Sequence, residues 1–275
     1  MNEQVVRFGA RDGLVGILTT PVQQRARFAV LLSNTGTHHR VGPYRLNVEL
    51  ARAFAADGIA TLRYDRSGLG DSARRDAPGS DHAHAVEDTR DAMTVLTAML
   101  GVDRFVLVAL CSGVDTAHEV SREDARVVGA VFIDGYAYPT AGFHWRRTLP
   151  RLFDAARWWR FARRRLHRWR HPDFFVEPVV DGSRVFTREI PTLDRYRDDV
   201  RLMAARGVRL LMVYTGAVGG SVNAPSQLYE MIGADISRRD VAVSWMPDAD
   251  HLFTSPSARR VLTETLRQWL GTVGG

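Results

Sequence analysis

The sequence predicts an α/β fold, a mostly parallel sheet of eight strands flanked by helices. Eight short apolar runs alternate with segments of helical periodicity along the 275 residues. Most of these runs lack a polar face, which is typical of strands that are buried on both sides. The expected strands are 4–8, 14–19, 28–33, 59–64, 105–110, 127–133, 209–214 and 241–245.

The expected helices lie between these strands. Apolar residues recur at helical spacing in 44–56, 84–100, 226–232 and 258–270, and another helix is expected directly after strand 105–110. A turn at Asp12-Gly13 joins the first two strands, so this pair can form an antiparallel edge of the sheet.

Composition narrows the class of protein. A hydrophobic content of 45% and a charged content of 25% are those of a soluble globular protein. We find no apolar run near 18 residues and no signal peptide at Met1–Ala10, so we expect a cytoplasmic protein. The single cysteine cannot form an internal disulfide or a thiolate metal cluster, and the nine histidines show no ligand spacing. We therefore expect neither a metal nor a cofactor.

The most informative stretch follows strand 105–110. In a nucleophile elbow, usually written G-x-S-x-G, small residues flank one nucleophile at a sharp strand-to-helix turn. Residues 109–113 read A-L-C-S-G, which places Cys111 at the nucleophile position. With Ser112 as the nucleophile, Leu110 and Val114 would occupy the small positions. The pattern therefore favours Cys111, although a free cysteine is also often a buried small hydrophobe.

His251 is the candidate general base. It lies in the segment D-A-D-H after the last expected strand and 140 residues after Cys111, in the order expected for an elbow nucleophile. A base at this place would take the thiol proton and leave a thiolate–imidazolium pair. The alternative is an ordinary surface histidine.

The sequence leaves the third member of the site open. The usual acid follows the strand at 209–214, yet no carboxylate occurs between Val200 and Tyr229. Asp134, at the end of the strand after the elbow, is the candidate that we favour. Asn223 could instead orient the histidine as a neutral residue, as in cysteine–histidine–asparagine sites. A cysteine–histidine pair without a third member is the remaining alternative.

Together these motifs resemble the α/β-hydrolase superfamily over nearly the whole chain. The stretch H-R-V-G at 39–42, with L-C-S-G at the elbow, is similar to hydrolases associated with bacterial exosortase systems, which are encoded beside acyl carrier and acyl-activating proteins. The cysteine at the elbow also resembles dienelactone hydrolases. The chain departs from the usual pattern of this superfamily because no acid follows the strand at 209–214, and we call this absent residue the late acid. The matching stretches are Asn34-Thr35-Gly36, D-R-S-G-L-G-D-S at 65–72, the elbow at 109–113 and D-A-D-H at 248–251.

The resemblance implies where an oxyanion would be stabilised. In this fold, one donor is the backbone N–H after the nucleophile and another comes from the loop after the third strand. These are Ser112 and either Thr35 or Gly36. Further candidates for substrate contact are His38, His39, Arg40, Tyr136 and Trp145.

The resemblance also implies a cap inserted at 136–205, between core segments 1–135 and 206–275. This stretch has no clear strand, and its apolar residues from Trp145 to Leu166 fall near helical spacing. Between Arg146 and Arg170 it holds ten arginines and one acid, whereas the whole chain has a net charge of +6. We expect a helical lid whose basic face is either solvated or binds an acidic acyl carrier protein. A membrane surface is less favoured, and nucleic acid is not expected.

These observations predict a cysteine-dependent acyl-transfer enzyme, a thioesterase or an acyltransferase. Cys111 would attack a small-molecule acyl ester or thioester, and His251 would move the protons. A cysteine suits thioester exchange because sulfur both attacks and departs. One alternative is a carboxylesterase or lactone hydrolase that uses the same residues. The other is a non-catalytic scaffold that binds an acidic partner.

Overall fold

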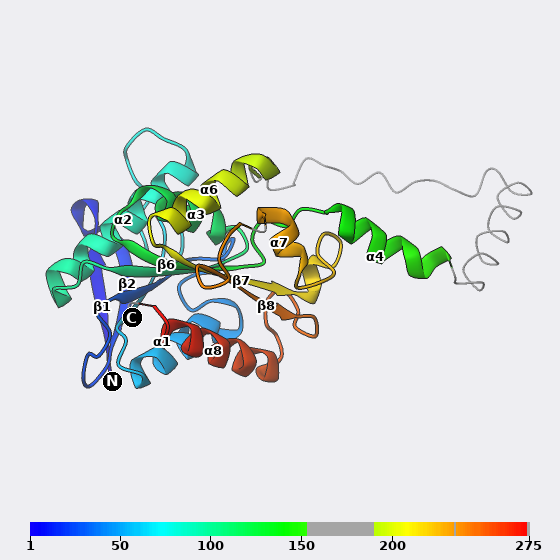
Figure 1. The fold of residues 1–275 in the computed structure, drawn as a ribbon. Helices are drawn as coiled ribbons and strands as arrows, with labels where there is room; N and C mark the ends of the chain where they lie inside the picture. Colours follow the sequence, from blue (N-terminus) through cyan, green and yellow to red (C-terminus); the bar gives the residue numbers. More distant parts are fainter. Residues whose placement is uncertain (153–189, 234, 274–275) are drawn as a thin grey trace, which may run out of the picture.

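Eight strands form a single sheet in the computed structural model, which describes residues 1–152, 190–233 and 235–273 (Figure 1). The order across the sheet is β1-β2-β4-β3-β5-β6-β7-β8. Strand β2 pairs antiparallel with β1 and β4, and all other neighbours are parallel. This confirms the predicted fold class. The strands are β1 (Asn2–Phe8), β2 (Leu14–Thr20), β3 (Ala29–Leu32), β4 (Thr61–Tyr64), β5 (Phe105–Leu110), β6 (Val127–Ile133), β7 (Arg209–Thr215) and β8 (Val241–Met246).

Helices cover both faces of the sheet (Figure 1). Helices α1 and α8 pack together on one face, and α2, α3 and α6 lie on the other. Helix α7 contacts α6 and α4, and α4 extends away from the sheet. The helices are α1 (Leu46–Ala56), α2 (Asp81–Leu100), α3 (Gly113–Glu123), α4 (Ala141–Leu152), α6 (Leu193–Ala205), α7 (Gln227–Ile232) and α8 (Pro256–Leu270).

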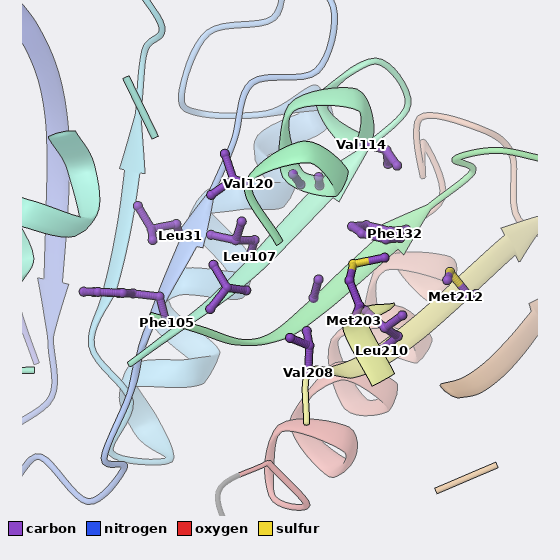
Figure 2. Close-up of a cluster of buried hydrophobic side chains, with 14 of the residues drawn as sticks. Leu31, Phe105, Leu107, Val114, Val120, Phe132, Met203, Val208, Leu210 and Met212 are labelled. Atoms are coloured by element: carbon purple, nitrogen blue, oxygen red, sulfur yellow. The ribbon is translucent and has the colours of Figure 1, made fainter. Parts of the chain in front are cut away.

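The central strand β5 shows why the strands lack a polar face. Phe105 and Leu107 belong to the cluster beneath α3 and α6, whereas Val106 and Val108 belong to the cluster beneath α1 and α8. Successive side chains point to opposite faces of a strand, so a strand that is covered on both sides must be apolar at every position. Figure 2 shows the first cluster, where Phe132 of β6 and Met203 of α6 join the side chains of β5.

Helix α6 was not expected from the sequence. The hydroxyl of Thr192 caps it by accepting a hydrogen bond from the Arg195 N–H at 3.3 Å. Its residues Tyr196, Val200 and Met203 are buried in the cluster under α3. The insertion predicted over 136–205 therefore includes a helix of the layer that covers the sheet.

Much of the predicted cap lies outside the described residues. This holds for 153–189, which contain Phe153, Trp159, Leu166 and most of the arginine-rich segment. Of the expected lid, the structure describes 136–152, which contain α4, and 190–205, which contain α6. Among the described helices, we find none with the length and apolar character needed to cross a membrane.

Candidate active site

Cys111 stands in a sharp turn between β5 and α3. Its φ of 57° lies in the left-handed region, which a residue other than glycine seldom adopts, and its N–H donates to the Ile133 carbonyl at 2.9 Å. A Cβ at Gly113 would lie 2.6 Å from the Asn34 carbonyl oxygen, so only glycine fits there. The close approach of the start of α3 to the loop after β3 thus explains the small residue two positions after Cys111.

His251 lies between Cys111 and a buried carboxylate. Its Nδ1 is 2.8 Å from Oδ2 of Asp134, and its side chain is also hydrogen-bonded to Cys111. The hydrogen bond to Asp134 and then that to Cys111 raise the pKa of His251 to about 10, whereas partial burial lowers it. The structure thus brings the three candidate residues of the site together as a chain, and it favours a protonated imidazole next to the sulfur.

Thr215 supplies the contacts that hold Asp134. Its N–H donates to Oδ1 of Asp134 at 2.7 Å and its hydroxyl donates to Oδ2 at 2.6 Å. Because Ile133 of β6 pairs with Val213 of β7, the ends of these parallel strands lie side by side. Sequence reasoning missed Thr215. The available signal was a hydroxyl residue at the end of β7, where the usual acid is absent.

The loop that carries His251 is held by its own hydrogen bonds and by one from the residue that follows β7. The Asp250 carboxylate accepts from the N–H groups of Leu252 and Thr254, both at 3.0 Å, and from the Thr254 hydroxyl at 2.6 Å. The N–H of Gly216 donates to the Ala249 carbonyl at 3.0 Å. These contacts tie the histidine loop to itself and to the end of β7.

The two loops that flank the sulfur are joined through Ser112. The Gly36 N–H donates to Oγ of Ser112 at 2.9 Å. This differs from the expectation that the Gly36 N–H is available to an oxyanion, because that N–H already has a partner. Among the described residues, no hydrogen bond engages the N–H of Ser112 or of Thr35. Of the candidate backbone donors, the N–H groups of Ser112 and Thr35 thus remain available within the described chain.

Arg40, a candidate for substrate contact, is occupied by two acids. Its guanidinium forms ion pairs with Asp65 and Asp71. Burial disfavours its charge, but hydrogen bonds to Asp71 and Asp65 outweigh burial and raise the pKa of Arg40. Asp65 also accepts from the Arg40 N–H at 2.6 Å and from the Asn34 amide at 3.3 Å. Arg40 thus binds together the loops after β3 and β4.

The other candidates for substrate contact differ in exposure. Tyr136 is buried and packs edge-on against Tyr196 and His118, with ring centroids 5.4 Å and 5.3 Å away, so it forms part of the core. Trp145 lies on α4 and is 65% exposed. His38 and His39 are exposed on the loop after β3.

Asn223, the neutral alternative to Asp134, is engaged with α4. Its Oδ1 accepts from Nε of Arg146 at 2.8 Å, and its Nδ2 donates to the Phe143 carbonyl at 3.2 Å. The geometry therefore favours Asp134 as the partner of His251. Within the described part of the chain, we find no group of histidine, cysteine and acidic side chains that could hold a metal ion.

Comparison with known proteins agrees with this architecture. The profile of the Alpha/beta hydrolase family matches residues 30–264, a span that contains Cys111, Asp134 and His251. A search of curated proteins finds no match.

Similar solved structures include an esterase domain from a Rhodothermus marinus protein, with 19% identity, a TM-score of 0.60 and all of both chains covered. The α/β hydrolase GrgF from Penicillium sp. sh18 is 17% identical, with a TM-score of 0.59 and all of both chains covered. An α/β serine hydrolase without lid from Xanthomonas campestris is 14% identical, with a TM-score of 0.54, 100% of this chain covered and 97% of that one. Structural similarity at such low sequence identity establishes the fold, and the match to the family profile establishes the family. The chain belongs to the Alpha/beta hydrolase family.

Proposed function

We propose that this protein is a cysteine-dependent acyl-transfer enzyme that acts on an acyl thioester through a covalent acyl-Cys111 intermediate. The observation that carries the proposal is the continuous contact from Cys111 through His251 to the buried Asp134. A thiol in an elbow, beside a histidine that a carboxylate holds in its charged form, has the environment of an activated nucleophile.

In the first step, the Cys111 thiolate attacks the carbonyl carbon, a C–S bond forms, and the π electrons move to the carbonyl oxygen. The N–H groups of Ser112 and Thr35 stabilise that oxyanion. Collapse reforms the carbonyl and breaks the bond to the leaving sulfur, which takes the proton from His251. Sulfur replaces sulfur, so the acyl-Cys111 product is close in energy to the thioester substrate.

In the second step, His251 accepts a proton from the incoming water, alcohol, amine or thiol as that nucleophile attacks acyl-Cys111. The second tetrahedral intermediate collapses, releases the acyl product and returns the Cys111 thiolate. Asp134 stabilises the imidazolium in both steps and holds the ring with Nδ1 toward the carboxylate and Nε2 toward the sulfur.

The acyl donor is proposed to be bound to an acyl carrier protein or to coenzyme A. Support comes from the arginine-rich segment that starts at α4, because carrier proteins and the phosphates of coenzyme A are acidic. In the described part of this segment, Trp145, Arg147 and Leu149 are exposed on α4. The narrower resemblance to exosortase-associated hydrolases favours the carrier protein.

A carboxylesterase or lactone hydrolase of the dienelactone type is the second candidate. Membership in the hydrolase family supports general hydrolase activity, and a solved esterase domain shares the fold. The same three residues would serve this reaction. A non-catalytic scaffold is the least supported alternative, because His251 has a carboxylate partner in Asp134, 2.8 Å away, although the late acid is missing.

The test is intact-mass analysis of the pure protein after incubation with matched acyl thioesters and aryl oxoesters. We expect an acyl adduct in the wild type and in Ser112→Ala, and none in Cys111→Ala. Turnover should fall at least about 10³-fold in Cys111→Ala. Ser237 is exposed and far in the sequence from the three site residues, so Ser237→Ala is the control and should behave as wild type.

The outcomes separate the three functions. A higher kcat/KM for the thioester than for the oxoester of the same acyl group supports the leading proposal. The reverse preference, with the adduct still on Cys111, would favour the esterase. An adduct that persists in Cys111→Ala, or the absence of any adduct and turnover, would overturn the cysteine mechanism.

A further inference from the structure

We infer that the side-chain hydroxyl of Ser112 is a third donor to the oxyanion, beside the backbone N–H groups of Ser112 and Thr35. The inference rests on the proposed function and adds a catalytic residue to it. It starts from the 2.9 Å hydrogen bond in which the Gly36 N–H donates to Oγ of Ser112.

This hydrogen bond uses the hydroxyl of Ser112 as an acceptor only. Within the described chain, we find no hydrogen bond in which the Ser112 O–H donates. Ser112 occupies the N-cap position of α3, where serine normally accepts from the first turn of the helix. Here it makes no such cap, and its φ of −66° and ψ of −20° are helical. The hydroxyl is thus directed away from the helix and toward the loop after β3.

The position of this hydroxyl fits an oxyanion hole. Oγ and N of one residue are three bonds apart, so the O–H and the N–H of Ser112 can reach the same acceptor. Gly36, the residue that binds Oγ, follows the other backbone donor, Thr35. No described atom lies within 4 Å of the place that a Cβ would take at Gly36, so the loop leaves open space there.

The hydrogen bond from Gly36 also makes the hydroxyl a better donor. An O–H group whose oxygen accepts a hydrogen bond is polarised, and chains of such bonds strengthen one another. When Cys111 attacks, the negative charge that develops on the carbonyl oxygen is stabilised by the Ser112 O–H. No proton is transferred in this contact, and the charge returns to the leaving group when the intermediate collapses.

Ser112→Ala and Ser112→Thr test the inference with paired substrates, a carbonyl ester and the matched thionoester in which sulfur replaces the carbonyl oxygen. Loss of one oxyanion donor should lower kcat/KM for the carbonyl substrate by about 10²-fold, mainly through kcat. Sulfur is a weak hydrogen-bond acceptor, so the same variant should lose less than about tenfold with the thionoester. Ser112→Thr keeps the O–H and should recover most of the rate.

The readouts separate this role from a structural one. If the Ser112 hydroxyl served only to hold Gly36 in place, Ser112→Ala would slow the reactions of both substrates equally. That result would overturn the inference. So would an unchanged rate with the carbonyl ester. The control Ser237→Ala should change neither rate, and thermal unfolding shows whether each variant is folded.

Failure of the proposed function gives a different result. If Cys111 takes no acyl adduct in the wild type, the cysteine mechanism fails. If the adduct forms on Cys111 and Ser112→Ala acylates as fast as wild type, only the role of the Ser112 hydroxyl fails.

Discussion

The loops around Cys111 and the helix α4 both follow carboxyl ends of strands, but they are held in opposite ways. At the site, Asp134 and Asp65 are fully buried, and each accepts several hydrogen bonds. Helix α4 is anchored through Phe143 and Arg146 near its start, whereas Trp145 and Leu149 are 65% and 47% exposed.

The difference separates two roles. A buried carboxylate is costly unless its partners are in place, so buried acids hold the loops of the site in one geometry. An exposed tryptophan and leucine one helical turn apart contribute little to folding and leave apolar surface in contact with solvent. The loops of the site therefore hold their side chains in one geometry, whereas α4 exposes apolar surface to solvent.

Among changes that compare the site loops with α4, loss of the buried charge at Asp134 should have the largest effect. Asp134→Asn keeps the shape but removes the charge that holds His251 as a cation, so we expect kcat/KM to fall by about 10²–10⁴-fold. Steady-state kinetics with an acyl thioester measures this. The matched control is Asp248→Asn, which neutralises an exposed acid in the histidine loop and should be near wild type. Equal rates for Asp134→Asn and wild type would remove Asp134 from the site.

The same substitution should change how stability depends on pH. Hydrogen bonds to Asp134 and Cys111 raise the pKa of His251 from an ordinary 6.5 to about 10. The stabilisation from its protonated form is therefore complete below about pH 6.5 and is lost as the pH rises toward 10. In Asp134→Asn the pKa of His251 should fall. The stabilisation from its protonated form should then be lost at a lower pH than in the wild type. Urea unfolding across pH 6–10 tests this, and an unchanged slope in the variant would contradict it.

Removal of Arg40, which forms ion pairs with Asp65 and Asp71, should mainly affect stability. Arg40→Ala leaves Asp65 buried without its counter-ion, so we expect the free energy of unfolding to fall by roughly 3 kcal/mol. Arg11→Ala removes the exposed ion pair with Asp76 and should cost at most about 1 kcal/mol, which makes it the matched control. A stable Arg40→Ala protein with a raised KM would instead indicate that Arg40 contacts the substrate.

Changes on the exposed face of α4 should have the smallest effect on the fold. Trp145→Ala and Arg147→Glu should change the free energy of unfolding by less than about 0.5 kcal/mol. If α4 docks a carrier protein, they should raise KM for a carrier-bound acyl donor about tenfold and leave a small aryl ester unaffected. Val261→Ala, an exposed apolar residue on α8, is the control. If the wild type and these two α4 variants had equal KM values for the carrier-bound donor, carrier docking at α4 would be contradicted.

The parts of the fold that the sequence predicted are those with a local signal. Strands such as β5 are apolar at every position, and the elbow needs small residues on both sides of Cys111. Helix α6 was missed because its apolar residues lie in a stretch rich in charge, although Thr192 offered a cap signal. The contacts of Arg40 were missed because its two acids lie in the loop after β4, 25 or more residues away in the sequence.

The sequence by itself determined the α/β class, the order of nucleophile and histidine, and the absence of an acid after β7. Only the tertiary structure decided which groups meet. Strand β6 lies beside β7, and this places Asp134 between Thr215 and His251. The loop after β3 lies beside the elbow, and this gives the Gly36 N–H to Ser112. The physical reason is that periodicity along the chain reports which face of an element is buried. Hydrogen bonds between loops depend on the order and register of strands, which no single segment encodes.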